Sequence, residues 1–277
     1  MSTEQTVKKI TVPILSAAKK KGKKIVMATA YDATFAALFD QTQKIDVLLV
    51  GDSLGMVIQG HTTTIPVTVE DIIYHTRAVS RGTKRAHICA DMPFMGNKVS
   101  IEKTVEFAAR LIQDGRAESV KIEGGKNIAK TVRAIVDADI PVIGHVGMTP
   151  QSVHAFGGFK TRGKTKTERD RIIEDAKAIE EAGAFALVLE GIPGALSGEI
   201  TELLNIPTIG IGAGPHCDGQ VLVGYDLLGI NDRFKPKFLK RFATLADDIR
   251  DAIINYADEV NDGSFPSEEH TTEIKKR

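Results

Sequence analysis

Short apolar stretches rich in Val, Ile and Leu alternate with segments of helical periodicity along almost the whole chain. Such stretches, bounded by turn residues, are typical of strands buried on both faces of a parallel sheet. The expected strands are residues 24–29, 46–51, 87–91, 119–123, 141–146, 186–190, 207–212 and 220–225. Eight alternating units in roughly 250 residues favour a closed (βα)8 TIM-type barrel, a single-domain α/β fold, over an open doubly wound sheet.

Helical periodicity between these strands predicts helices over residues 69–80, 101–113, 128–137, 167–181 and 236–260. The last helix has apolar residues at helical spacing and is expected to pack on the barrel or on a neighbouring subunit. Residues 261–277 are polar and without periodicity, so we expect a mobile tail there. The predicted organisation is a catalytic barrel over residues 1–260 and a tail over 261–277.

Composition and charge narrow the classes of partner. Of 277 residues, 42% are hydrophobic and 26% charged, as in ordinary globular proteins. The 36 Lys and Arg balance 36 Asp and Glu, which gives no basic excess to attract nucleic acid. Neither a signal-peptide pattern nor a membrane-spanning run is present, so a cytoplasmic protein without membrane contact is expected. Cys89 and Cys217 are expected to be reduced thiols.

Acidic residues stand where three consecutive expected strands end: Asp52, Asp91 and Glu123. The carboxyl ends of barrel strands line one pocket, so these side chains are expected to meet there. Their hard oxygens suit Mg²⁺, which binds few carboxylates and leaves positions for an oxygen-rich substrate. The alternative is that each acid caps the next helix or pairs with a surface lysine.

Three further candidate residues lie at or near the ends of expected strands. Lys121 lies two residues before Glu123, so both side chains share a face, and its cation can hold a substrate carboxylate. A Lys–Glu neighbour pair and a Schiff-base lysine are the alternatives. His145 ends its strand and is expected to contact substrate unless it is a hydrogen-bonded core histidine. Glu190 has apolar neighbours that suit a general base, or it is a carboxylate satisfied by helix N–H groups.

Two glycine-rich segments raise the possibility of phosphate binding. Residues 210–214 follow the seventh strand, where many barrels bind phosphate, although these glycines also permit a tight turn. Residues 158–165 match the P-loop pattern letter for letter. A P-loop emerges directly from a strand, however, and here the preceding strand is expected to end near Val146. A mobile active-site loop is therefore favoured over a nucleotide switch.

Several motifs resemble the 3-methyl-2-oxobutanoate hydroxymethyltransferase family, which is also called the ketopantoate hydroxymethyltransferase family. The likeness covers roughly residues 6–258. The motifs are Gly51-Asp52-Ser53-Leu54-Gly55-Met56, Gln59-Gly60-His61, Pro66-Val67-Thr68-Val69, Tyr74-His75-Thr76, Asp91-Met92-Pro93-Phe94, Val120-Lys121-Ile122-Glu123-Gly124-Gly125, Gly144-His145-Val146-Gly147-Met148-Thr149-Pro150-Gln151 and Gly210-Ile211-Gly212-Ala213-Gly214. The sequence departs from the family where Gly191-Ile192 replaces Cys-Val and where Asn97 replaces a common Tyr. The proposed base is retained.

The resemblance implies a barrel of the phosphoenolpyruvate/pyruvate superfamily that assembles as a homodecamer. It implies transfer of a hydroxymethyl group from 5,10-methylenetetrahydrofolate to 3-methyl-2-oxobutanoate, giving 2-dehydropantoate and tetrahydrofolate in pantothenate synthesis, through a Mg²⁺-stabilised enolate. Asp52, Asp91 and Glu123 match the metal-site residues, and Ser53, Lys121 and both aspartates match the contacts to the keto acid. Glu190 matches the proton acceptor, whereas no folate-contacting residue is identified. The alternative is another Mg²⁺-dependent carbon–carbon lyase or mutase that uses no folate.

Overall fold

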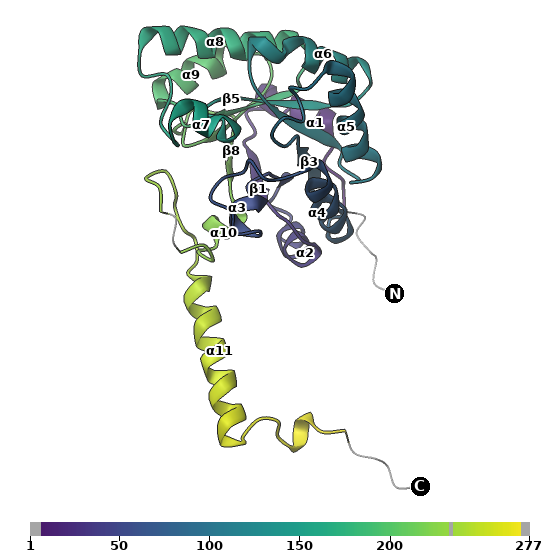
Figure 1. Ribbon diagram of the computed structural model, residues 1–277, viewed down its shortest axis with the longest axis vertical. Helices are drawn as coiled ribbons and strands as arrows, with labels where there is room; N and C mark the ends of the chain where they lie inside the picture. Colours follow the sequence, from purple (N-terminus) through teal and green to yellow (C-terminus); the bar gives the residue numbers. More distant parts are fainter. Residues whose placement is uncertain (1–6, 233–234, 273–277) are drawn as a thin grey trace. The chain divides into compact units, whose positions relative to one another are not determined.

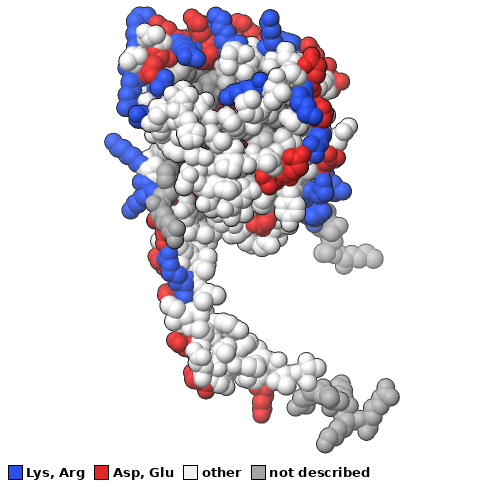
Figure 2. Space-filling model, viewed as in Figure 1, with Lys and Arg blue, Asp and Glu red and all other residues white. Residues whose placement is uncertain are grey.

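The structure is a computed structural model that describes residues 7–232 and 235–272 (Figure 1). The chain divides into two compact units, Met1–Gly224 and Tyr225–Arg277. No helix within the described residues is both long and apolar enough to cross a membrane. On the face of the first unit seen in Figure 2, basic and acidic side chains are interspersed, in keeping with their equal numbers.

The first unit is a closed barrel of parallel strands in the order β1 to β8. The predicted (βα)8 TIM-type barrel is therefore confirmed, and each expected strand is found within two residues of its expected ends except at the last. The strands are β1 (Ile25–Thr29), β2 (Val47–Val50), β3 (His87–Asp91), β4 (Ser119–Glu123), β5 (Val142–Gly147), β6 (Ala186–Glu190), β7 (Thr208–Ile211) and β8 (Gly219–Leu222). The pairing of β1 with β8 closes the ring, with Ile25 opposite Gly219.

Helices surround the strands, as Figure 1 shows for α4, α5, α6 and α8. The α-helices are α1 (Val12–Ser16), α2 (Ala33–Gln41), α3 (Leu54–Val57), α4 (Val69–Gly82), α5 (Ile101–Gln113), α6 (Ala129–Asp137), α7 (Val153–Phe156), α8 (Lys166–Glu181), α9 (Gly194–Leu203), α10 (Gly224–Leu227) and α11 (Leu245–Asp262). Short 3₁₀ helices are η1 (Lys19–Lys21), η2 (Lys126–Ile128), η3 (Pro150–Ser152) and η4 (Glu268–His270). Side-chain caps fix several starts: Thr68 and Asp71 form a capping box at α4, and Ser100 accepts from Lys103 N at α5.

The barrel interior changes from apolar to charged along the strands. Residues two apart on a strand point to the same side, so Cys89 shares its face with Asp91, and Val188 with Glu190. The apolar residues nearer the amino ends form one core cluster with the segment before β1. Its members are Ile10, Leu15, Ala18, Ile25, Met27, Val47, Leu49, Cys89, Ile143, Ala186, Val188, Ile209 and Val221. The carboxyl ends are thereby left to the polar groups.

The second unit differs from the sequence expectation. The last helix, expected over residues 236–260, is α11 and begins at Leu245. The backbone before it is held in other hydrogen bonds, from Phe242 N to Leu227 O at 2.9 Å and from Leu245 N to Leu228 O at 3.2 Å. Ile249 and Ile253 on α11 are 51% and 62% exposed. Three expectations stay predictions: that this helix packs on the barrel or on a second subunit, that the catalytic domain ends at residue 260, and that the tail is mobile. Residues 273–277 of that tail lie outside the described residues.

Candidate active site

Three buried carboxylates meet at the carboxyl ends of β2, β3 and β4. Asp52 is 4% exposed, Asp91 2% and Glu123 3%. The amide N of Asp52 donates to Asp91 Oδ2 at 3.2 Å, which places the first two acids side by side. Gln151 joins Asp52 to Glu123 through hydrogen bonds to both carboxylates. The structure therefore brings together the three acids that the strand-end pattern selected, and helix caps do not account for them.

The acids act on one another electrostatically. Burial, followed by the charges of Asp91 and Glu123, raises the pKa of Asp52 well above its usual value. Burial and the charge of Glu123 likewise raise the pKa of Asp91, although Lys121 opposes them. Packing like charges in a buried place costs free energy unless a cation compensates them. The cluster is thus an environment that favours an additional positive charge.

Lys121 supplies one buried cation. Its Nζ lies 2.8 Å from Asp91 Oδ1, and its side chain is only 6% exposed. Burial acts to lower the pKa of Lys121, but the charges of Asp91, Glu123 and Asp52 raise it above its usual value. A Schiff-base lysine needs a neutral amine, so this setting favours a protonated Lys121 that binds an anion. The neighbour-pair alternative also fails in its simple form, because Lys121 pairs with Asp91 on the adjacent strand.

His145 lies between Glu123 and Glu190. Its Nδ1 is 3.4 Å from Glu123 Oε1 and 3.3 Å from Lys121 Nζ, and its Nε2 is 3.1 Å from Glu190 Oε2. Burial and Lys121 act to lower the pKa of His145, but its interactions with Glu123 and Glu190 raise it to about 9. Burial acts to raise the pKa of Glu123, but His145 holds it below its usual value. This imidazole links the acid cluster to Glu190. The Glu190 carboxylate pairs with the His145 side chain rather than with helix N–H groups.

Ser53 flanks the same strand end. A Cβ added at Gly51 would lie 2.9 Å from Ser53 Oγ and 3.6 Å from Asp91 Oδ2, so both oxygens face this glycine. Tyr31 Oη and Ser53 Oγ are 2.9 Å apart, and their hydrogen bond fixes the serine side chain. Because Gly51 has no side chain, the Ser53 hydroxyl and the Asp91 carboxylate can both lie close to the backbone at the end of β2. This position agrees with a substrate contact by Ser53.

The cluster fits a divalent cation held by few direct protein ligands. Within the described residues, no three His, Cys, Asp or Glu side chains form a complete metal-ligand set by themselves. Mg²⁺ needs no such set, because it binds through one or two carboxylates and completes its shell with other oxygens. The buried Gln151 Oε1 also lacks a hydrogen-bond partner in the described part of the chain, which adds a neutral oxygen to this donor set.

Comparison with known proteins gives the family. The family ketopantoate hydroxymethyltransferase matches residues 9–268. The chain belongs to this family. The 3-methyl-2-oxobutanoate hydroxymethyltransferase of Syntrophus aciditrophicus is 53% identical over 98% of this chain and 99% of its own length. The enzyme of that name from Clostridioides difficile is 51% identical, and the alignment covers 97% of each chain. This ketopantoate hydroxymethyltransferase family member is therefore an enzyme, a hydroxymethyltransferase that acts on small molecules.

Solved structures of low identity share the fold of this family member. The phosphoenolpyruvate phosphomutase of Streptomyces platensis superposes with a TM-score of 0.62 at 14% identity, covering 95% of this chain and 92% of that one. A 2,3-dimethylmalate lyase of the PEP mutase/isocitrate lyase superfamily gives 0.61 at 16% identity over 94% of this chain and 88% of that one. Both support the barrel alone, because fold likeness at this identity does not transfer a reaction.

Gln151 is the residue of this ketopantoate hydroxymethyltransferase family site that sequence reasoning missed. It is 2% exposed and lies in η3, beyond the end of β5. Its Nε2 donates to Asp52 Oδ2 and to Met92 O, both at 2.9 Å, and its backbone N donates to Glu123 Oε2 at 3.1 Å. Because both partners of Nε2 are acceptors, the orientation of the amide is determined. The only available signal was its place in the Gly144–Gln151 motif.

The two glycine-rich segments have structural explanations. Residues 158–165 follow α7 and not a strand, and the backbone N atoms of Gly163 and Lys164 both donate to Glu168 Oε2. The P-loop alternative is therefore disfavoured by the connection and by these internal bonds. After β7, Gly214 has a φ of +76°, and a Cβ there would lie 2.9 Å from Gly194 Cα. A tight turn and close packing on α9 thus account for that glycine.

Proposed function

We propose that this enzyme transfers a hydroxymethyl group from 5,10-methylenetetrahydrofolate to 3-methyl-2-oxobutanoate, with the consumption of one water. The products are 2-dehydropantoate and tetrahydrofolate, in pantothenate synthesis. Family membership over residues 9–268 supports this reaction. The observation that carries the chemical assignment is the continuous chain of charged groups from the buried Asp91 through Lys121 and His145 to the partly buried Glu190. Such a chain joins an anion-binding end to a proton-accepting end.

The metal side of the proposed site consists of Asp52, Asp91 and Glu123. Their mutual repulsion and burial suit a divalent cation, for which we propose Mg²⁺. When bound, Mg²⁺ stabilises the negative charge that develops on the substrate keto oxygen. Gln151 holds Asp52 and Glu123 in fixed orientations through its amide and backbone N–H groups. Supporting hydrogen bonds of this kind commonly set ligand geometry in metal sites.

The proposed roles of the remaining residues follow from their charges. Lys121 and Ser53 bind the substrate carboxylate and orient the C3–H bond toward Glu190. Glu190 accepts the C3 proton, and the resulting carbon nucleophile forms a bond to the one-carbon unit of the folate. His145 is 3.1 Å from Glu190 and orients its carboxylate toward the substrate. Burial of this group excludes water, which strengthens each of these electrostatic interactions.

Product analysis with and without the folate tests this proposal. Purified enzyme, Mg²⁺ and 3-methyl-2-oxobutanoate are expected to give 2-dehydropantoate only when 5,10-methylenetetrahydrofolate is present. Cleavage or rearrangement of a keto acid without folate would instead favour the lyase or mutase alternative. Glu202→Gln, an exposed position on α9, is a matched control for substitutions at Glu190.

We also propose a homodecamer, which rests on the family resemblance, and the cytoplasmic location expected from the sequence. Analytical ultracentrifugation of the purified full chain tests the assembly. A mass close to ten times 29.9 kDa is the expected result. A stable monomer or dimer that retains full activity would contradict the decamer without bearing on the chemistry of the acid cluster.

A further inference from the structure

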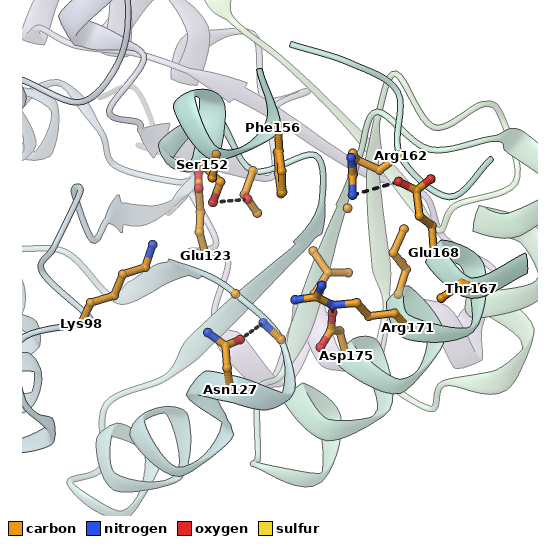
Figure 3. Close-up of a pocket in the computed structure, with 17 residues that line it drawn as sticks. Lys98, Glu123, Asn127, Ser152, Phe156, Arg162, Thr167, Glu168, Arg171 and Asp175 are labelled. Atoms are coloured by element: carbon orange, nitrogen blue, oxygen red, sulfur yellow. Dashed lines mark hydrogen bonds and ion pairs between the residues drawn. The ribbon is translucent and has the colours of Figure 1, made fainter. Parts of the chain in front are cut away.

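A cavity of about 280 Å³ adjoins the acid cluster, and Figure 3 shows the side chains around it. Glu123 forms part of its wall, so the cavity shares a boundary with the proposed metal side of the site. Other lining residues come from the ends of β4 and β5, from α7 and from the first turns of α8. Gly147, also in the wall, pairs in register with Glu190 on β6. The cavity therefore borders the metal side at Glu123, and its wall at Gly147 lies beside the backbone of Glu190.

The inner wall offers a surface for a flat ring. Phe156, Val146 and Ile172 are its apolar members. Gly147 has a φ of +101°, and a Cβ there would come within 2.4 Å of Glu190 O, so this wall can bear no side chain at that point. The Phe156 ring also lies 4.5 Å from the Arg162 guanidinium, which fixes one of its faces. The aromatic ring of Phe156 and the bare backbone at Gly147 together suit a planar heterocycle.

The outer wall is polar. Asp175 Oδ1 accepts from Lys126 N at 2.8 Å, and its Oδ2 is 3.9 Å from Arg171 Nε. This carboxylate lines the cavity and is 20% exposed, whereas the Arg171 side chain is 79% exposed. Lys98 lines the cavity on another side, near Glu123 in Figure 3. The mostly buried Asp175 carboxylate and the more exposed Arg171 suit a ligand with a donor-rich ring edge and an anionic tail.

We propose that this cavity binds the reduced folate donor, an inference that rests on the proposed function. The pteridine has two adjacent N–H donors on its pyrimidine edge, which match the Asp175 carboxylate, and its planar rings face Phe156. A cavity of about 280 Å³ is at the small end of ligand sites, so it holds the bicyclic ring and leaves the glutamate tail outside. Arg171 and Lys98 are placed to pair with the tail carboxylates. The keto acid occupies the acid cluster, so the donor reaches C3 from this side.

Variants of the wall test the assignment. We expect Phe156→Leu and Asp175→Asn each to raise the KM for 5,10-methylenetetrahydrofolate and the Kd for tetrahydrofolate about tenfold, which corresponds to about 1.4 kcal/mol. The KM for the keto acid is expected to change less than twofold. Asp170→Asn and Arg169→Gln are the matched controls, because both positions are on α8 and outside the cavity wall. Calorimetric titration with tetrahydrofolate gives the Kd directly.

The tail contact has its own test. Arg171→Gln is expected to weaken tetrahydrofolate binding several-fold and to leave unchanged the binding of tetrahydropteroate, which lacks the glutamate. Equal effects on both ligands would overturn the assignment of Arg171 to the tail. Unchanged Kd values for tetrahydrofolate in both Phe156→Leu and Arg171→Gln would overturn the cavity assignment, even where Asp175→Asn fails to fold.

Failure of the proposed function is distinguishable from failure of this inference. If the wild-type enzyme forms no 2-dehydropantoate from methylenetetrahydrofolate, the reaction is wrong whatever the variants bind. If the wild type forms the product and the wall variants keep its donor KM, the reaction stands and the cavity assignment is wrong. Loss of C3-proton exchange in a wall variant would also count against it, since that step belongs to the acid cluster.

Discussion

Buried aspartates stand at both ends of the barrel, and their surroundings differ. At the amino end, Asp40 accepts hydrogen bonds from three consecutive backbone N–H groups, of Lys84, Arg85 and Ala86. Asp46 accepts from Val26 N and forms ion pairs with Lys23 and Arg85. Each of these carboxylates thus has hydrogen-bond donors of its own, and Asp46 has two cations as well.

At the carboxyl end each buried aspartate also has like-charged acids among its close neighbours. Asp52 lies beside Asp91 and near Glu123, and the charge of Lys121 acts on all three, whereas among them His145 pairs with Glu123 alone. Evolution retains such repulsion where a cation or substrate compensates it, and natural sites give up stability for this purpose. We therefore expect the acids at the amino end to stabilise the fold, and we propose that the crowded acids at the carboxyl end perform the chemistry.

The largest expected effect is on catalysis. Glu190→Gln removes the proposed proton acceptor and keeps the side-chain size, so we expect kcat to fall on the order of 10²- to 10⁴-fold. Stability should change little, because Glu190 is only partly buried. Steady-state kinetics checks the first expectation and urea unfolding the second. Activity within tenfold of wild type, with Glu202→Gln unaffected, would remove Glu190 from this role.

The amino end should respond in stability. Asp46→Asn removes the charge that pairs with Arg85 and with the half-exposed Lys23, and we expect a loss of about 1 to 2 kcal/mol because solvent screens part of this attraction. Chemical unfolding measures the loss, and activity per folded molecule should remain. A stability equal to that of the wild type would mean that the ion pairs of Asp46 do not stabilise the fold.

The pH dependence of unfolding tests the same end. Burial lowers the pKa of His87, the first residue of β3, to about 4. The unfolded chain binds this proton below about pH 6.5, whereas the folded chain resists it, so stability falls as pH falls between these values. The expected loss from pH 7 to pH 5 is about 2 kcal/mol. His87→Gln should remove that part of the slope, and an identical slope in the variant would refute it.

Substitution of Gln151 tests whether its hydrogen bonds keep the acid cluster in place. Gln151→Ala removes the donors to Asp52 and Met92 O, and loss of such supporting groups commonly costs 10- to 100-fold in activity or metal affinity, so we expect about that range. Calorimetric titration with Mg²⁺ gives a measurement independent of turnover. Gln113→Ala, at the end of α5 and away from the cluster, is the control. Unchanged Mg²⁺ affinity and activity would make the Gln151 contacts incidental.

The smallest expected change in stability has the opposite sign to that of Asp46→Asn. Asp52→Asn keeps an acceptor for Gln151 and removes one of the crowded charges, so in EDTA it should stabilise the fold by about 0.5 to 2 kcal/mol while activity is lost. Parallel unfolding of Asp46→Asn and Asp52→Asn shows the contrast directly. Destabilisation by both would show that the two ends do not differ as described.

The sequence predicts those parts that depend on local pattern. Strand boundaries such as His87–Asp91 are recovered because apolar runs end at charged residues, and the barrel geometry then brings Asp52, Asp91 and Glu123 together. Gln151 and the donor cavity depend on contacts between segments far apart, as between Gln151 and Asp52, and no periodicity reports these. The sequence predicts the start of α11 too early, because residues 236–244 have an apolar pattern, whereas Phe242 N donates to Leu227 O and not to a helical partner.

The most direct test of the account is exchange of the C3 proton of 3-methyl-2-oxobutanoate in D₂O, followed by NMR. We predict that wild type with Mg²⁺ exchanges this proton, that EDTA stops the exchange, and that Asp46→Asn retains it per folded molecule. Glu190→Gln should lose it. Exchange that persists in Glu190→Gln or in EDTA, or no exchange by the wild type with Mg²⁺ whether or not tetrahydrofolate is present, would contradict the claim that the carboxyl-end acids and Glu190 remove this proton.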